Sequence, residues 1–496
     1  MNRLVVVFLI YSSLFSGAPA LGKEPVKVGS KVFTESVILG ELATQIGSQA
    51  GVKSEHVDQL GGTRVVWDSL TDGQIDVYPE YTGTILQELL PGTKPADLTA
   101  ELAKHGIGMT RSLGFNDTYA LGMTEARANN LGISRISDLA THPELKVGLS
   151  NEFLERKDGW PLIRDVYGLG RLDVSGLDHD LAYRALAGET TDVTDLYTTD
   201  AEIAYYHLKV LTDDRHIFPT YDAVYLYRLD LQQKAPKFIA ALQKLQGAIS
   251  PNEMIGMNAA CKLGKLSETK VARDFLVKRG FSNDNSEQAT LLSLFLERTR
   301  EHCLLVAVSL FSAIVVAVPL GVIAFKYPTI GNFILTIVAI VYTVPTIALL
   351  VLMIPLLGIG TWPAISALFL YALLPIVRNT HSGFQGISRS LRTSAAVLGL
   401  SPSAQLWRVE LPLAAPSILA GIKTAAIMNV GTATIGALIG AGGYGQFILA
   451  GVRLADNRLI LLGAVPAAVL ALGVQGFFTL IEDLLWGRRA VRQRSR

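Results

Sequence analysis

The sequence predicts a chain of two unlike parts, an α/β region in two lobes followed by an all-α membrane domain. Half of the 496 residues are hydrophobic, and they are distributed unevenly along the chain. Up to about residue 290, short β-rich runs alternate with amphipathic helical stretches, a pattern typical of α/β folds. From Cys303 onward long apolar runs dominate, and most of them have the length that a helix needs to cross a bilayer.

Composition excludes several classes of function. The formal net charge is +1, and no basic stripe occurs outside the last few residues, which argues against nucleic acid as a partner. Cys261 and Cys303 stand one in each part, so we expect neither a disulfide framework nor a metal cluster. No G-x-x-x-x-G-K-S/T phosphate loop occurs, since Gly264-Lys265 is followed by Leu266. We therefore expect no metal, no cofactor, no enzymatic activity and no ATP hydrolysis by this chain itself.

The N-terminus has the pattern of a secretory signal peptide, which we assign to residues 1–22. Arg3 precedes the apolar run 4–14, and the A-P-A tripeptide at 18–20 predicts cleavage after Ala20. An uncleaved signal anchor is the alternative. In either case the domain that follows is expected on the outer (periplasmic or extracellular) side of the membrane.

Residues 23–283 form the expected α/β domain. Because about 260 residues are many for one core, we expect two lobes, with the chain crossing between them near Tyr119 and returning near Tyr221. Ligands of α/β folds bind at the carboxyl ends of strands, so we expect a cleft there. The predicted strands are residues 26–29, 74–78, 119–122, 145–149 and 222–227, and the predicted helices are residues 36–48, 97–104, 179–187 and 236–246.

The stretch 75–84, with the sequence IDVYPEYTGT, is the most informative part of this domain. A short apolar strand leads into an aromatic and acidic turn, and a helical run at 85–90 is expected directly afterwards. Free N–H groups at a helix N-terminus favour an anionic group, and the ring of Tyr81 favours a cation. A zwitterion is the simplest ligand with both charges. An ordinary packed strand, turn and helix is the alternative.

Five segments of the domain carry a resemblance when they are taken together. They are KVGSKVFTES (27–36), GGT (61–63), the stretch 75–84, NDTYAL (116–121) and DLYTTD (195–200). They resemble the substrate-binding proteins of osmoprotectant ABC importers, the ProX/OpuC-like family that takes up glycine betaine, choline or carnitine. The resemblance covers nearly all of residues 26–283 and implies a two-lobed periplasmic-binding-protein fold, type II-like.

The resemblance also implies a ligand site. Four tyrosines of the family surround a quaternary ammonium, and the matching positions here are Tyr81, Tyr119, Tyr197 and Tyr221. The matching positions for the ligand's carboxylate are Lys31, Thr84 and Arg156. A quaternary ammonium has no N–H group to donate, so aromatic faces must recognise it, each worth roughly 0.5–2 kcal/mol when desolvated. The alternatives are ordinary core tyrosines and solvent-exposed charges at Lys31 and Arg156.

Residues 284–302 are the expected linker, and residues 303–496 are the expected membrane domain, a polytopic permease in contact with lipid. The expected spans are 303–325, 333–357, 362–378, 413–441 and 459–484. An odd number of spans places the C-terminus inside, and the basic residues agree, because the expected outer loops contain only Arg453 and Arg458. We therefore expect a multi-pass protein of the inner (cytoplasmic) membrane.

The long inner segment 388–412 is the second functional element. It contains TSAAVLG (393–399) and WRVELP (407–412), which resemble the cytoplasmic EAA loop of ABC importer permeases. The loop residues are Thr393, Ala395, Gly399, Leu411 and Pro412, and Thr393 stands where the family has a glutamate. This resemblance implies a separate cytoplasmic ATP-binding subunit and, because such ATPases work as dimers, two copies of this chain. An ordinary amphipathic helix beside the membrane is the alternative.

These resemblances favour an importer subunit that captures a betaine-type zwitterion and passes it through its own permease domain. A ligand-gated channel or sensor with the same two-lobed domain is the rival hypothesis. Such channels insert their pore within the binding domain, whereas this domain runs unbroken to Asn283, and they have no use for an EAA-like loop. The choice among betaine, carnitine, choline and ergothioneine stays open at this point.

Overall fold

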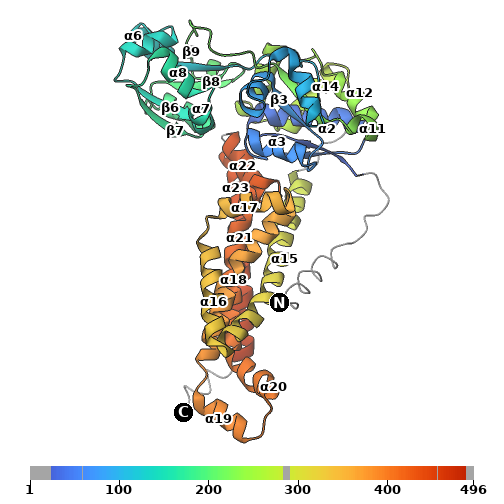
Figure 1. Cartoon of the computed structure of the whole chain (residues 1–496), viewed down its shortest axis with the longest axis vertical. Helices are drawn as coiled ribbons and strands as arrows, with labels where there is room; N and C mark the ends of the chain where they lie inside the picture. Colours follow the sequence, from blue (N-terminus) through green and yellow to red (C-terminus); the bar gives the residue numbers. More distant parts are fainter. Residues whose placement is uncertain (1–23, 59, 283–290, 455, 488–496) are drawn as a thin grey trace.

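The computed structural model describes residues 24–58, 60–282, 291–454 and 456–487, and the expected signal peptide at 1–22 lies outside them. Figure 1 shows an α/β domain at one end of a long helical bundle. The α/β domain divides into two parts, here called lobe 1 and lobe 2, and the opposite end of the bundle carries two short helices. This arrangement confirms the predicted fold class.

Lobe 1 is built on a five-stranded sheet. Its strands are β1 (Val26–Gly29), β2 (Ser54–Val57), β3 (Val77–Tyr81), β4 (Ile107–Met109) and β10 (Ala223–Arg228). They are arranged in the order β2-β1-β3-β10-β4, with β1 parallel to β2 and β3, and β10 antiparallel to β3 and β4. All five residues of β3 are buried, because it is the central strand. The sheet therefore presents the carboxyl end of β3 toward the second lobe.

Lobe 2 contains two smaller sheets. Their strands are β5 (Tyr119–Thr124), β6 (Lys146–Ser150), β7 (Asp173–Leu177), β8 (Thr194–Tyr197) and β9 (Leu208–Val210). β5 lies between β8 and β9 and is antiparallel to both, whereas β6 and β7 form a parallel pair. The register of β5 and β8 places Tyr119 directly opposite Tyr197.

The helices of the α/β domain surround these sheets. In lobe 1 they are α2 (Thr34–Gln49), α3 (Thr63–Thr71), α4 (Thr82–Thr84), α5 (Leu98–Lys104), α11 (Leu231–Lys234), α12 (Pro236–Gln243), α13 (Pro251–Lys262) and α14 (Glu268–Lys278). In lobe 2 they are α6 (Glu125–Leu131), α7 (Asn151–Glu155), α8 (Trp160–Tyr167), α9 (His179–Ala187) and α10 (Glu202–Tyr205). All four predicted helices form, and the structure adds the others.

The helical run expected at 85–90 differs from the structure. Helical structure already begins at Thr82, and residues Ile85–Leu89 have π geometry. The N–H group of Thr82 donates to the backbone oxygen of Asp222 at 3.0 Å. The first N–H of this turn is therefore used within the fold, and a helix only three residues long supplies no strong anion site of its own.

Two crossing segments connect the lobes, and they confirm the predicted crossing points. Residues 110–118 lead from β4 into β5, and residues 211–222 return from β9 to β10. The two segments pair with each other, because the N–H group of Asp117 donates to the backbone oxygen of Tyr221 at 3.0 Å. Tyr119 and Tyr221 therefore lie at the base of the cleft between the lobes.

Apolar helices form the bundle. They are α15 (Leu291–Lys326), α16 (Pro328–Thr343), α17 (Thr346–Leu357), α18 (Thr361–Gln385), α21 (Leu411–Thr432), α22 (Gly445–Arg453) and α23 (Asn457–Glu482). One of them, α22, lies outside every expected span. Because α15 begins at Leu291, residues 291–302 of the expected linker are helical. Among the described residues, four helices are long and apolar enough to cross a membrane, or five if the pair of α16 and α17 counts as one span.

The span expected at 333–357 is broken. α16 and α17 form an angle of 101°, and Pro345 lies between them. Proline has no N–H group and restricts the preceding residue to extended conformations, so the helix ends before it. Figure 1 shows α16 running along the bundle and α17 at the end near the α/β domain.

Candidate functional site

The predicted ligand-binding residues come together at a cavity between the lobes. In this structure the cavity is small and nearly filled by side chains, with about 20 Å³ of space accessible to the centre of a water molecule. All seven predicted residues line it, together with three that the sequence analysis did not assign. The lining residues are Lys31, Phe33, Tyr81, Thr84, Asp117, Tyr119, Glu152, Arg156, Tyr197 and Tyr221.

Aromatic rings form much of the wall. We call Tyr81, Tyr119, Tyr197 and Tyr221 the tyrosine box. The centroid of the Tyr119 ring lies 5.0 Å from that of Tyr197 and 5.6 Å from that of Tyr221. Phe33 adds a fifth ring, with its centroid 5.8 Å from that of Tyr197 and 6.3 Å from that of Tyr81. Phe33 immediately precedes α2 within the segment 27–36, where the sequence analysis treated it as part of a motif only.

The fold places each ring of the box. Tyr119 and Tyr197 face each other across the β5–β8 pair, so their side chains share one face of the sheet. Tyr81 is the last residue of β3, and Tyr221 follows the return crossing. Gly83 packs against Tyr221, since a Cβ atom at Gly83 would lie 2.5 Å from its ring. A side chain at this position would therefore displace Tyr221.

Two carboxylates accept hydrogen bonds from tyrosine hydroxyls of the box. The Tyr81 hydroxyl donates to Glu35 Oε1 at 2.7 Å, and the Tyr221 hydroxyl donates to Asp158 Oδ2 at 2.7 Å. Burial and these neighbouring carboxylates raise the pKa of both tyrosines above the ordinary value, so both phenols are neutral at pH 7. Glu35 Oε2 also accepts from Thr199 Oγ1 at 2.6 Å and from Asn258 Nδ2 at 2.9 Å. Glu35 thus joins lobe 1 to lobe 2.

An acidic group, Asp117, lines the cavity beside the rings. Burial first, and then the negative charges of Glu35 and Asp200, raise the pKa of Asp117 well above its ordinary value. A cation in the cavity would favour its charged form. Within the part of the chain that the structure describes, no group of three His, Cys, Asp or Glu residues is arranged to hold a metal ion.

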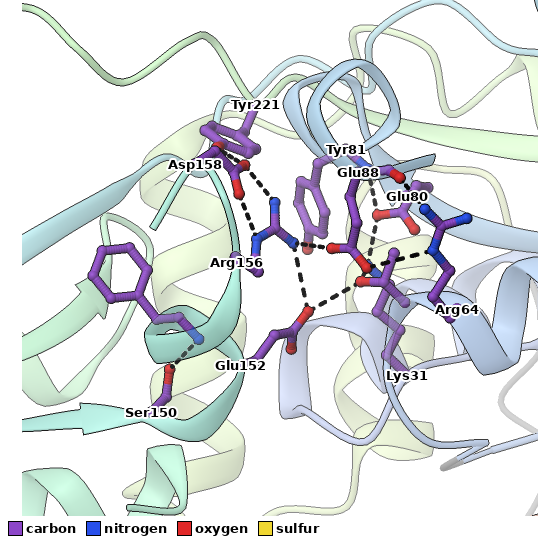
Figure 2. A network of polar contacts seen from close by, with 12 residues as sticks. Lys31, Arg64, Glu80, Tyr81, Glu88, Ser150, Glu152, Arg156, Asp158 and Tyr221 are labelled. Carbon is purple, nitrogen blue, oxygen red and sulfur yellow. Dashed lines mark hydrogen bonds and ion pairs between the residues drawn. The ribbon is translucent and has the colours of Figure 1, made fainter. Parts of the chain in front are cut away.

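Lys31 lies in the cavity wall with a fixed partner. Its Nζ is 2.6 Å from Glu80 Oε1 and donates to Thr63 Oγ1 at 3.1 Å (Figure 2). Glu80 is fully buried and also accepts from the N–H group of Tyr81. The sequence analysis treated Lys31 as a partner of the ligand, but the fold already neutralises its charge. Thr84 is buried in the same wall.

Arg156 is the second predicted cation, and carboxylates surround it as well. Its Nε and Nη2 contact the two oxygens of Asp158 at 2.9 and 2.6 Å (Figure 2). Its Nη1 lies 2.9 Å from Glu88 Oε2 and 3.5 Å from Glu152 Oε1. The guanidinium carbon is 5.3 Å from the centroid of Tyr119, so the charge lies over a box ring. The alternative of a solvent-exposed charge is wrong for Arg156, because its side chain is only 5% exposed.

The predicted coupling loop lies at the end of the bundle farthest from the α/β domain (Figure 1). It contains α19 (Arg389–Val397), α20 (Pro402–Gln405) and a π turn at Leu406–Glu410 that continues into α21. Gly399 ends the first helix with φ +76°, a conformation that favours glycine. Ala395 is buried, and the Thr393 hydroxyl donates to the backbone oxygen of Arg389. Leu411 and Pro412 are the first two residues of α21.

Apolar side chains are exposed on this loop. Val397, Leu398 and Trp407 are 81%, 80% and 66% exposed, although they lie outside the apolar part of the bundle. Exposed apolar groups of this kind are found where a protein contacts another protein or a membrane. Arg392 and Glu410 pair at 3.3 Å and connect α19 to the π turn. An ion pair therefore joins the two parts of the loop, which presents exposed apolar side chains.

Two family models match the chain. One, described as the substrate binding domain of ABC-type glycine betaine transport system, matches residues 24–278, about half of the chain, and includes the tyrosine box. The other, described as the binding-protein-dependent transport system inner membrane component, matches residues 313–486 and includes the coupling loop. Each half of the chain thus has its own match.

Curated relatives give the same division. The choline transport system permease protein OpuBB of Bacillus subtilis (strain 168) is 42% identical over 190 residues, which are 38% of this chain and 88% of the relative. The carnitine transport binding protein OpuCC of Listeria monocytogenes is 32% identical over 297 residues, 56% of this chain and 96% of the relative. The ergothioneine transport permease/ergothioneine binding protein EgtU of Helicobacter pylori (strain G27) is 37% identical over 289 residues, 56% of this chain and 52% of the relative.

Proposed function

Because the chain belongs to the family of substrate-binding domains of ABC-type glycine betaine transport systems and continues into a permease domain of the same systems, we propose that it captures a quaternary-ammonium zwitterion outside the membrane. Its own permease domain then takes up the ligand, driven by a separate ATP-binding subunit. The protein is a multi-pass membrane component of an ABC importer in which binding domain and permease are one chain.

The observation that best supports this proposal is the set of five aromatic rings around one cavity. Four tyrosines and Phe33 line it, and the hydroxyls of Tyr81 and Tyr221 donate to Glu35 and Asp158. Ring faces attract a cation through their quadrupole, and a trimethylammonium group needs several of them because it cannot donate a hydrogen bond. This arrangement supports a quaternary ammonium as the part of the ligand that the box recognises.

The carboxylate end of the ligand is assigned to Arg156, with Thr84 and Lys31 in the same wall. Names of the relatives mention glycine betaine, carnitine, choline and ergothioneine. Choline has no carboxylate to offer Arg156, whereas a betaine can contact both the rings and the guanidinium. A betaine-type zwitterion is therefore the proposed substrate.

The coupling loop supports the proposed ATP-binding partner. Its exposed Val397, Leu398 and Trp407 offer an apolar surface for a groove on that subunit. One chain carries one such loop, and a dimeric ATPase has two grooves, so two copies of this chain assemble around a twofold axis in the proposed complex.

Calorimetric titration of the purified chain with glycine betaine, carnitine, ergothioneine and choline tests the ligand class. We expect at least one carboxylated compound to bind more tightly than choline, because Arg156 favours a carboxylate. Choline binding as tightly as every carboxylated compound would contradict the zwitterion proposal. Ligand flux through vesicles that contain the chain but no ATP-binding subunit would favour the rival channel.

A further inference from the structure

One ion pair crosses the ligand cleft. Arg156 follows α7 in lobe 2, and Glu88 lies in the π turn Ile85–Leu89 of lobe 1. Arg156 Nη1 and Glu88 Oε2 are 2.9 Å apart, and Figure 2 shows the two side chains pointing toward each other. The other edge of the guanidinium is occupied within lobe 2, because Nε and Nη2 both contact Asp158. Nη1 is therefore the nitrogen that a ligand carboxylate has to share with Glu88.

The carboxylates around Arg156 carry more negative charge than its single positive charge can balance. Three carboxylates, those of Glu88, Glu152 and Asp158, contact this single guanidinium. Lys31 offsets this negative charge only in part, because its Nζ is paired with Glu80 Oε1 at 2.6 Å. A fourth carboxylate brought by a ligand would meet like charges at short range in a partly desolvated site. One of the existing carboxylates must then move away.

Glu88 is the carboxylate that can leave. Its side chain is 24% exposed, whereas that of Asp158 is 4% exposed and also holds Tyr221. Glu152 contacts Nη1 only at 3.5 Å, so its release would gain little. Glu88 borders an open groove at the rim of the cleft, and Arg64, which lines the same groove, lies 3.9 Å from its carboxylate. A partner for the displaced charge is thus present outside the cavity.

The surroundings of Glu88 also disfavour its charge. Burial raises the pKa of Glu88, the positive charge of Arg156 offsets part of this effect, and the negative charge of Glu152 adds to it. Movement into the groove relieves both the burial and the repulsion.

Resting on the proposed function, we propose that Glu88 is an internal competitor of the ligand: its carboxylate occupies Arg156 Nη1 and moves into the rim groove when a zwitterion binds. A zwitterion has to displace Glu88. Its apparent association constant is therefore the intrinsic one multiplied by the fraction of molecules in which Glu88 has released Arg156. Choline brings no carboxylate and leaves the pair in place. Glu88 therefore narrows the difference in affinity between zwitterions and choline.

Titration calorimetry on the full chain in lipid nanodiscs, with glycine betaine, carnitine and choline, tests this role. Glu88→Gln keeps the shape of the side chain and removes its charge, so the carboxylated compounds should bind roughly five- to tenfold more tightly. Choline affinity should stay the same or fall. Glu155→Gln is the matched control, because Glu155 is an exposed carboxylate on the same groove, and it should change each affinity by less than about twofold.

Glu88→Ala is a second variant, which has no amide that could bond the ligand. It should show the same selective gain. Zwitterion binding that is unchanged or weaker in both Glu88 variants, or an equal gain for choline, would overturn the proposal. A parent chain that binds none of the three compounds would instead refute the proposed function, and the role of Glu88 with it. A parent that binds them while the variants behave like it refutes the role of Glu88 alone.

Discussion

Individual residues of the tyrosine box depend on buried carboxylates as well as on apolar packing. Tyr81 donates to Glu35 and Tyr221 donates to Asp158, so two of the four rings are fixed by a negative group on their far side. A fixed ring loses little entropy when the ligand binds, and negative charge behind it adds to the attraction for a cation. Tyr119 and Tyr197 are fixed instead by the pairing of β5 and β8. The four rings are therefore not interchangeable in mutagenesis.

Replacement of Tyr119 or Tyr197 by Leu keeps apolar area but removes the quadrupole. Each change should weaken zwitterion binding by roughly 1–2 kcal/mol, or about five- to thirtyfold in Kd. Phe at the same positions is the control and should cost less, because the ring face is retained. Titration calorimetry measures both series. Leu variants that bind like the parent would show that these are ordinary core tyrosines.

The sequence could predict seven of the ten residues that line the cavity, but not how the charged ones are paired. Positions such as Tyr81 and Thr84 lie within a motif, so the resemblance identified them directly. The partners of Lys31 and Arg156 are different, because Glu80 and Glu88 approach them only when distant segments and both lobes are in place. No local pattern marks such pairs. From the resemblance, Lys31 and Arg156 are expected to bind the ligand's carboxylate. In the structure, both already contact carboxylates of the protein.

At the level of elements, the sequence predicted the first and last residues of α9 correctly. Strand β3, in contrast, begins three residues later than predicted and continues to Tyr81. The strand contains Pro79, which usually excludes a central strand. Here Pro79 lies opposite Tyr225, whose N–H and C=O groups both bond Thr110 on the other side. β1 has already ended its pairing with β3 at Val77. No ladder bond is lost at Pro79, and only the register with β10 reveals this.

Helix α9 begins with a titrating residue that contacts the box. The His179 ring lies 4.6 Å from that of Tyr197, and its Nε2 lies 3.2 Å from Asp200 Oδ2. Burial alone lowers the pKa of His179, but hydrogen bonding and charge from Asp195 and Asp200 outweigh burial, and the pKa is well above its ordinary value. The start of α9 is therefore held by a charged histidine at neutral pH.

The stability of the binding domain should fall as pH rises above the ordinary histidine pKa. A raised pKa means that the folded state binds the proton more tightly than the unfolded state, so the stabilisation is complete below about pH 6.5 and is lost as pH rises through the folded pKa. Denaturant unfolding of residues 23–283 at pH 6, 7.5 and 9 measures this. His179→Gln should remove most of this decrease, because the group whose pKa is raised is then absent. His105→Gln, an exposed control in lobe 1, should show the same change of unfolding free energy with pH as the parent. A His179 variant that also shows the parent's change would contradict the stabilising role of charged His179.

At the scale of the whole molecule, lobe 1 is attached to the end of the bundle opposite the coupling loop. Gln74 Oε1 accepts from the N–H group of Ile359 at 2.6 Å, and Leu454, between α22 and α23, packs into the apolar core of the α/β domain. Arg453, one of two arginines in the expected outer loops, pairs with Glu268 of α14. Charge counting along the sequence indicated a scarcity of arginine in these loops. It could not show that Arg453 is held by the binding domain.

The Glu268–Arg453 pair should couple ligand capture to transport. Arg453 Nη2 and Nε lie 2.7 and 2.9 Å from Glu268 Oε1, and the two side chains are 5% and 9% exposed. Removal of one partner takes this ion pair away from the other buried charge, which typically costs about 3–5 kcal/mol, so Arg453→Ala or Glu268→Ala should weaken the attachment of lobe 1 to the permease. The cleft lies elsewhere in the domain, and ligand Kd should change by less than about twofold.

Ligand-stimulated ATP hydrolysis and uptake by the assembled complex in proteoliposomes measure this coupling. Each single variant should lose roughly tenfold or more of its uptake, because the binding domain would no longer deliver ligand at a fixed position. The double exchange Glu268→Arg with Arg453→Glu restores opposite charges at the same place and should recover part of the activity, which a merely destabilised fold would not. Single variants that transport like the parent, or an exchange that is as inactive as both of them, would show that this pair only contributes to packing.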